Sequence, residues 1–313
     1  MIDARPTRLR GVLAPVVTPF HANLEANATE FVRHCRWLLE NGAGLAIFGT
    51  NSEANSLSVA ERIRLTDTLL EAGVPAASMM PGTGTSSLTD TVLLTRHAVD
   101  AGAAGVLILP PFFYKKISDD GLFAYYAEVI ERIGDARMSL YLYNIPALSG
   151  VPITLELIER LLKRYPETIA GVKDSSGDWH NTKAMIDVFA RDGLDIFPAS
   201  EALLSTALPL GAAGCISATA NVNPGDIALL CERLRNEKAT ALQEKVTLIR
   251  KLFETVPMIP AMKQVIAYGT DDRDWMTVRP PLEQLKPDGT AMLIDALTTA
   301  GFDFKRLKHR LAH

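Results

Sequence analysis

The sequence predicts an α/β fold, a closed (β/α)8 TIM barrel followed by a C-terminal helical extension. Over the first 220 residues, short apolar runs alternate with longer amphipathic stretches, and eight such runs can be counted. The runs lack the alternation of apolar and polar residues that marks a strand with one solvent-exposed face. This pattern is typical of parallel strands covered on both sides. Eight strand–helix units favour a closed barrel over an open doubly wound sheet.

The expected strands are, in order, VLAPVV (12–17), LAIFG (45–49), ASMMPG (77–82), GVLIL (105–109), SLYLY (139–143), IAGVK (169–173), LDIFP (194–198) and GCIS (214–217). Helices are expected between them. In the stretch 58–73, Ser58 and Glu61 have the spacing of a capping box, and Gly73 stands where a helix should end. No dinucleotide-binding fingerprint follows the first run, which argues against the open sheet.

The character of the chain changes after Asn223-Pro224, where helical patterns continue without another strand-like run. We therefore expect a barrel over residues 1–223. Residues 224–313 are expected to form a helical region packed on the barrel, with a loop at 271–289.

Composition and charge indicate a globular protein without a nucleic-acid partner or a membrane anchor. The 313 residues are 48% hydrophobic and 22% charged, which suits a globular protein with a large buried core. A net charge of -4 with interspersed signs indicates neither a nucleic-acid partner nor a basic membrane anchor. No signal peptide or membrane span is recognisable. Three cysteines without a CxxC pair suit a reducing compartment, so a cytoplasmic location is expected.

Reactive residues of a barrel enzyme are expected at the carboxyl ends of its strands. Lys173 ends the sixth run, where an unpaired ammonium would be costly to bury. It either reaches the surface or lies in a pocket where losing its proton is useful. A desolvated lysine amine can attack a carbonyl to form a Schiff base. Tyr143, at the end of the fifth run, would supply a phenol for proton transfer, although a packed core tyrosine is the alternative.

The polar turn 49–53 supports the reactive interpretation, because the hydroxyl and backbone N–H groups of Thr50 and Asn51 can hold a substrate carboxylate. Glu53 is either a partner in the site or half of a salt bridge across the barrel mouth. The six histidines show neither an HxH nor an HExxH spacing, so a metal-dependent aldolase is disfavoured. We expect no metal and no cofactor besides the covalent imine.

Four motifs resemble the dihydrodipicolinate synthase/N-acetylneuraminate lyase family: GTNSE (49–53), YNIP (143–146), GVKDSSGD (171–178) and GCISATANVNP (214–224). The resemblance runs through essentially the whole chain, from GVLAPVVTPF (11–20) onward. It implies a Schiff base between Lys173 and a 2-oxo acid, usually pyruvate, with Tyr143 as the acid/base. It also implies that Thr50 and Asn51 bind the carboxylate, and that the protein is a homotetramer or dimer.

Some residues depart from the pattern of true dihydrodipicolinate synthases. Leu148 stands where those enzymes carry an arginine that binds the second substrate's carboxylate, and Asn51-Ser52 replaces their Thr-Gly. Their second tyrosine, donated across a dimer interface, corresponds either to Phe113 or to Tyr114. The departures indicate a relative of the 4-hydroxy-2-oxoglutarate aldolases. Ser175 and Ile216, at the ends of the sixth and eighth runs, complete the expected substrate-binding residues.

The function predicted from these features is a class I lyase. It would cleave or form a carbon–carbon bond between pyruvate and an aldehyde, for example in 4-hydroxy-2-oxoglutarate or a 2-keto-3-deoxy sugar acid. Three alternatives stay open: a Schiff-base dehydratase or deaminase, a dihydrodipicolinate synthase, and a non-catalytic 2-oxo-acid binder that keeps the fold.

Overall fold

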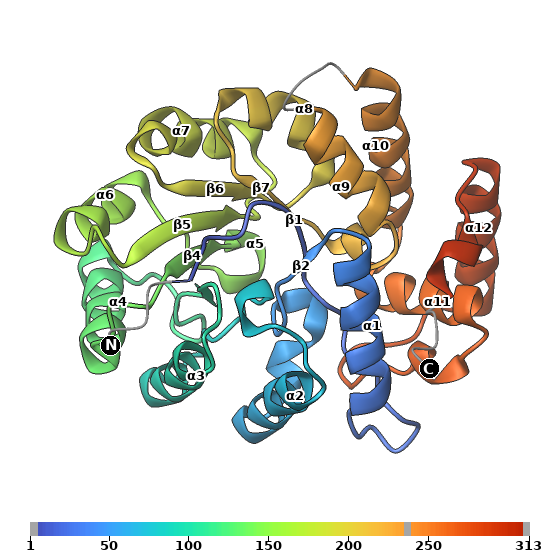
Figure 1. Cartoon of the computed structure of the whole chain (residues 1–313), viewed down its shortest axis with the longest axis horizontal. Helices are drawn as coiled ribbons and strands as arrows, with labels where there is room; N and C mark the ends of the chain where they lie inside the picture. The colour runs from blue at the N-terminus through green and yellow to red at the C-terminus, as the bar shows by residue number, and fades with distance from the viewer. Residues whose placement is uncertain (1–5, 235–238, 309–313) are drawn as a thin grey trace.

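The computed structural model describes residues 6–234 and 239–308. Its strands form a ring surrounded by helices (Figure 1). The strands are β1 (Gly11–Ala14), β2 (Gly44–Leu45), β3 (Val106–Ile108), β4 (Leu140–Asn144), β5 (Ile169–Asp174), β6 (Asp195–Pro198) and β7 (Gly214–Ile216). They pair in parallel in two groups, ordered β2-β1-β7 and β3-β4-β5-β6. The run that ends in Lys173 is therefore β5.

The third predicted strand, at 77–82, is replaced by a 3₁₀ turn (Ala76–Ser78) and an extended segment. This segment still joins β2 to β3 through single parallel bridges, Leu45 with Met79 and Gly82 with Leu107. Pro81 interrupts it, because proline has no N–H to donate to a ladder. On the other side of the ring, the Ala213 N–H donates to the Ile196 carbonyl at 2.9 Å. Eight segments thus close the ring, and the predicted barrel is confirmed.

The helices lie outside the ring, as the amphipathic stretches predict. They are α1 (Ala28–Glu40), α2 (Val59–Glu71), α3 (Leu88–Asp100), α4 (Asp119–Ile133), α6 (Leu155–Arg164) and α7 (Trp179–Phe189), with the short α5 (Pro146–Ser149) and α8 (Leu204–Ala207). The predicted capping box is confirmed at the start of α2. There, Ser58 accepts from the Glu61 N–H and Glu61 accepts from the Ser58 N–H. Gly73 has a φ of 78°, as expected of a residue that follows a helix end.

Tyr141 fills the lower barrel interior, below the carboxyl ends of the strands. Its hydroxyl donates to buried Asp195 at 3.2 Å, and Arg10 reaches the same carboxylate at 2.7 Å. Burial, together with this carboxylate, raises the pKa of the Tyr141 phenol. Gly171 makes room for the ring, because a Cβ there would lie 2.4 Å from the Asp195 carbonyl oxygen and 2.5 Å from the ring of Tyr141.

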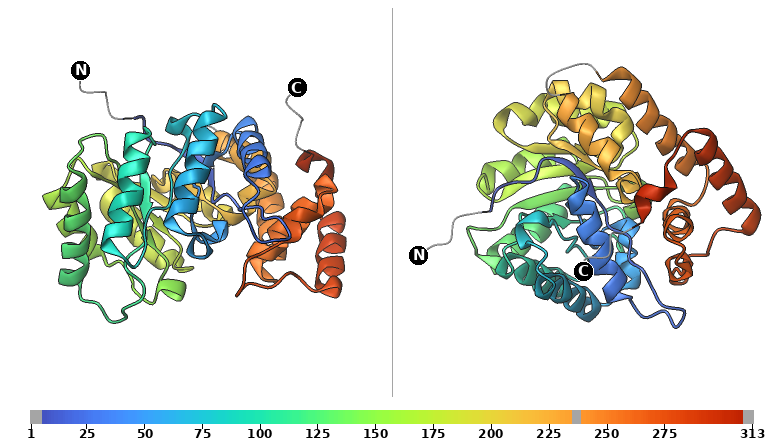
Figure 2. Two further views of the ribbon diagram at one scale, coloured as in Figure 1. Left: turned by 90° about the horizontal axis from the view of Figure 1, so that it is seen from below. Right: turned by 45° about the vertical axis from the view of Figure 1, so that its right-hand side comes forward.

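The C-terminal region contains α9 (Pro224–Arg233), α10 (Thr240–Glu254), α11 (Met258–Thr270) and α12 (Pro287–Thr299). Figure 2 shows α10, α11 and α12 gathered on one side of the barrel. Val246 and Ile266 share one hydrophobic cluster with Val12 of β1. Residues 235–238 and 309–313 of the predicted helical region lie outside the described residues. Among the described helices, none has the length and apolar character to cross a membrane.

A buried ion pair ties this region to the turn after β2. Lys263 Nζ of α11 lies 2.7 Å from Glu53 Oε1, and both side chains are fully buried. The Arg279 N–H donates to the other Glu53 oxygen at 2.9 Å. Burial lowers the pKa of Lys263 to about 8, against the opposing effect of the Glu53 carboxylate. Glu53 adopts a left-handed backbone (φ 55°).

We predict that Gly171→Ala destabilises the barrel by about 1–3 kcal/mol, because the added methyl overpacks the Tyr141 ring and the β6 backbone. Urea denaturation measures the change. Gly289→Ala in α12 is the matched control, since a Cβ there meets nothing within 4 Å. Alanine is also the better helix former, so the control should be neutral or stabilising. Equal unfolding midpoints for the two variants would contradict the packing argument.

We predict that Lys263→Met lowers the free energy of unfolding by about 3–5 kcal/mol, because it leaves a buried carboxylate unpaired. The double variant Glu53→Gln/Lys263→Met should be less destabilised, since no buried charge remains. Lys183→Met is the control, because Lys183 makes a half-exposed pair with Asp187 at 2.5 Å. Such a pair contributes less than about 1 kcal/mol. Similar midpoints for the two single variants would refute the role of the buried pair.

Candidate active site

A cavity of about 440 Å³ opens at the carboxyl ends of the strands. Several of the sequence-predicted site residues line it together: Thr50, Asn51, Tyr143, Leu148, Lys173, Ser175 and Ile216. They come from different segments of the ring, so the barrel itself brings them to one place. A volume of this size suits a small-molecule ligand.

Lys173 and Tyr143 form the centre of this cavity. The two residues are direct partners in the register of β4 and β5. Parallel partners point to the same face of a sheet, and Lys173 Nζ lies 4.3 Å from the centre of the Tyr143 ring. Each residue is 2% exposed. A buried amine and a phenol thus share one end of the cavity, as their positions in the sequence predict.

Thr50 connects this pair to the turn after β2. Its Oγ1 lies 3.1 Å from the Tyr143 hydroxyl. Two hydrogen bonds of Ser52 hold the 3₁₀ turn η1 (Thr50–Ser52) in place. The Ser52 hydroxyl accepts from the Gly49 N–H, and the Ser52 carbonyl accepts from the Thr18 hydroxyl at 2.7 Å. Thr50 and Asn51 therefore present their polar groups to the cavity from a fixed loop.

Asp174 fixes the polar turn that follows Lys173. Its carboxylate accepts from Asn144 Nδ2 at 2.8 Å and from the Thr182 hydroxyl at 2.5 Å. The backbone N–H and hydroxyl of Ser176 donate to it at 3.1 and 2.9 Å. These bonds join the ends of β4 and β5 to the start of α7.

Three sequence-predicted residues lie elsewhere. Phe113 and Tyr114 are 73% and 69% exposed and do not line the cavity within this chain. They sit on an extended loop after β3, where no strand directs their side chains into the barrel. The exchange of a tyrosine across a dimer interface stays a prediction. Glu53 lies behind the turn, in its buried pair with Lys263, and not in the cavity.

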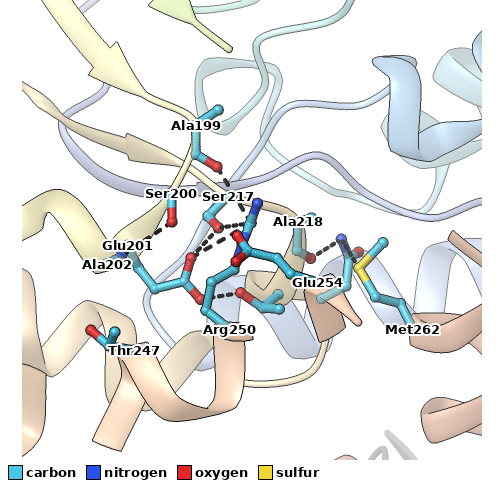
Figure 3. Close-up of polar contacts among 12 residues, drawn as sticks. Ala199, Ser200, Glu201, Ala202, Ser217, Ala218, Thr247, Arg250, Glu254 and Met262 are labelled. Carbon is cyan, nitrogen blue, oxygen red and sulfur yellow. Dashed lines mark hydrogen bonds and ion pairs between the residues drawn. The ribbon is translucent and has the colours of Figure 1, made fainter. Parts of the chain in front are cut away.

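The opposite wall of the cavity comes from the C-terminal region, which sequence reasoning left out of the site. Arg250 and Glu254 of α10, together with Ser200 after β6, line this wall (Figure 3). One signal was available. Val246, Ile249 and Phe253 are the buried face of α10, and Arg250 follows Val246 by four residues. It therefore lies within the apolar stripe. An arginine inside such a stripe, like a lysine at the end of an apolar strand, either reaches the surface or lies in a pocket.

Comparison with known proteins agrees with this geometry. The dihydrodipicolinate synthetase family model matches residues 8–300. An uncharacterized DapA-like lyase of Chloroflexus aurantiacus is 34% identical over 288 residues, covering 91% of this chain and 94% of the relative. The crystal structure of dihydrodipicolinate synthase from Agrobacterium tumefaciens str. C58 superposes with a TM-score of 0.86 at 29% identity, covering 93% of this chain and 99% of that one.

A second solved structure is that of YagE, an E. coli K12 prophage protein of the dihydrodipicolinic acid synthase family, in complex with pyruvate. It has a TM-score of 0.85 and 25% identity, and covers 94% of this chain and 99% of its own. The sequence match, the shared barrel and the arrangement of Lys173, Tyr143 and Thr50 thus lead to one conclusion: the chain belongs to the dihydrodipicolinate synthetase family.

Proposed function

We propose that this protein is a Schiff-base-forming lyase that cleaves or forms a carbon–carbon bond between pyruvate and an aldehyde. The observation that carries the proposal is the buried Lys173 amine at the cavity, 4.3 Å from the Tyr143 ring, with the Tyr143 hydroxyl 3.1 Å from Thr50. A core lysine with a purely structural role has no need of a neighbouring phenol and an open cavity. The pyruvate bound in the related YagE structure supports the choice of 2-oxo acid.

Imine formation begins when the neutral Lys173 amine attacks C2 of the 2-oxo acid. The resulting carbinolamine loses its hydroxyl as water, and the Tyr143 phenol supplies the proton that this departure requires. Thr50 orients the phenol through the 3.1 Å contact. Thr50 and Asn51 bind the substrate carboxylate, which places C2 against the amine. The product of these steps is a protonated imine.

Bond cleavage follows from the electron demand of this imine. In a 4-hydroxy-2-oxo acid, removal of the C4 hydroxyl proton lets the C3–C4 bond break. C4 leaves as the aldehyde, and the electron pair moves into the imine to form an enamine. The enamine takes a proton at C3, and water then hydrolyses the imine to release pyruvate and the free amine. The imine supplies the electron sink, so the proposed chemistry requires no added cofactor.

Dihydrodipicolinate synthesis is a second candidate, because the Agrobacterium relative carries that name. At the position where the resemblance places the carboxylate-binding arginine, however, Leu148 lines the cavity with an uncharged side chain. This substitution favours the lyase. A dehydratase or deaminase would begin with the same imine but release no pyruvate. Incubation with candidate 2-oxo acids and an assay for pyruvate therefore separates the two: a dehydrated product without pyruvate would contradict the lyase.

We predict that borohydride added with pyruvate traps a covalent adduct on the peptide that contains Lys173, detected by mass spectrometry. Lys173→Met should abolish the adduct, because no other amine lies in the proposed position. Lys183→Met is the control, since Lys183 pairs with Asp187 on exposed α7 and should leave trapping unchanged. Wild-type protein without an adduct at Lys173 would overturn the proposed function.

We predict that Tyr143→Phe lowers kcat by roughly 10²–10⁴-fold, because the proton donor is lost while the ring is kept. Borohydride trapping should still occur, but more slowly. Tyr141→Phe removes a hydroxyl two residues away, one that bonds to Asp195 and lies outside the cavity. It should therefore leave kcat close to that of the wild type. If both variants lose activity to the same extent, the effect is structural and Tyr143 is not the proton donor.

A further inference from the structure

Arg250 is the central side chain of the cavity wall formed by α10. Its Nε lies 2.7 Å from Glu254 Oε1, and its Nη1 donates to the Ser217 hydroxyl at 3.1 Å (Figure 3). Nη1 also lies 3.5 Å from the Ala199 carbonyl and 3.9 Å from Glu201 Oε2. In the described part of the chain, Nη2 has no hydrogen-bond partner. One edge of the guanidinium therefore remains available to a ligand.

Glu201 anchors the guanidinium from behind. Its side chain is fully buried and is not part of the cavity lining. Its two carboxylate oxygens accept from the hydroxyls of Ser217 and Thr219. Gln243 of α10 donates to the Glu201 carbonyl at 3.0 Å, which holds the helix against this segment. Because its oxygens are already used, Glu201 positions Arg250 and is not itself a substrate ligand.

Glu254 differs from Glu201 in its exposure and contacts. It lies one turn after Arg250 on the same helix, its side chain is 48% exposed, and it lines the cavity. Its bond to Arg250 Nε uses one carboxylate oxygen. The wall thus offers a hydrogen-bond donor, Arg250 Nη2, beside an acceptor, the carboxylate of Glu254.

The charge of this wall determines which ligand suits it. Two carboxylates, Glu201 and Glu254, face one guanidinium. An incoming carboxylate would compete with both of them and would meet like charge. A hydroxyl group both donates and accepts, so a hydroxylated carbon chain can accept from Arg250 and donate to Glu254 without adding charge.

We propose that Arg250 and Glu254 recognise the aldehyde-derived half of the substrate and select a neutral, hydroxylated chain. The substrate class is then a 4-hydroxy-2-oxo acid with further hydroxyl groups beyond C4. This inference rests on the proposed function, since it assumes that pyruvate occupies the Lys173 end. It assigns substrate selection to the C-terminal helical region, whereas the chemistry belongs to the barrel strands.

The test measures kcat/KM for bond formation between pyruvate and three aldehydes: glyceraldehyde, which carries hydroxyls; glyoxylate, which carries a carboxylate; and propanal, which carries neither. The wild type should prefer glyceraldehyde over each of the others by at least about tenfold, consistent with a charge-assisted hydrogen bond. Arg250→Lys keeps the charge but replaces the three guanidinium nitrogens with one, so the free Nη2 donor is lost, and it should reduce the glyceraldehyde/propanal ratio by about tenfold or more. Glu254→Gln removes one negative charge and should raise the glyoxylate/glyceraldehyde ratio several-fold.

The control is Glu128→Gln, which removes the carboxylate from an exposed arginine–glutamate pair on α4, outside the cavity. It should leave all ratios unchanged. Ratios are used because a loss of folded protein lowers every rate equally. The Glu254→Gln variant keeps the test valid if Arg250→Lys folds poorly.

Borohydride trapping with pyruvate distinguishes a failure of the proposed function at Lys173 from a failure of the inference about Arg250 and Glu254. If no adduct forms at Lys173, the proposed function fails and the inference fails with it. If the adduct forms, three results would each overturn the inference alone: no turnover of glyceraldehyde, a wild-type preference for glyoxylate, or unchanged aldehyde ratios in both variants at the α10 wall.

Discussion

The buried ion pair between Glu53 and Lys263 joins the turn after β2 to the C-terminal helices. Glu53 closes the turn that presents Thr50 and Asn51, and Lys263 belongs to α11, next in the chain to the helix that carries Arg250. Burying both charges costs free energy that is recovered only while the pair is intact. Displacement of the C-terminal helices would leave Glu53 unpaired behind the turn that carries Thr50 and Asn51. The pair thus couples the position of the C-terminal helices to that of this turn.

Lys173 is also a buried lysine, and its surroundings differ from those of Lys263. Lys263 faces a carboxylate at 2.7 Å, which favours its charged form. Lys173 faces the Tyr143 ring, and the neighbouring carboxylate of Asp174 is occupied by Asn144, Ser176 and Thr182. Lys263 is held by a counter-ion and does not line the cavity, whereas Lys173 lines the cavity beside a phenol. This contrast within one chain supports the proposed assignment of chemistry to Lys173.

Much of the barrel, and the placement of Lys173 beside Tyr143, could be predicted from the sequence, because both depend on local patterns. Apolar runs mark the strands, and parallel neighbours place Tyr143 beside Lys173 whatever the details of the loops. The segment 77–82 lost its strand character to Pro81, although it kept its place in the ring. Arg250 and the partner of Glu53 could not be located in the same way. Each lies more than 190 residues from the turn 49–53, and only the packing of α10 and α11 brings these segments to the cavity and the turn.

The proposed division of roles between the barrel strands and α10 determines how substrate preference can change. In the proposed function, the residues that handle the imine, Lys173 and Tyr143, lie on strands whose positions are set by the ring. The wall of α10 presents one cation between two carboxylates, and a single substitution at the exposed Glu254 alters its charge without touching the strands. With Glu254 neutral, the guanidinium is opposed only by Glu201, and a carboxylate becomes a better ligand. On the proposed function, the same Lys173 end can therefore serve neutral and anionic aldehydes, with the choice made by the helical region.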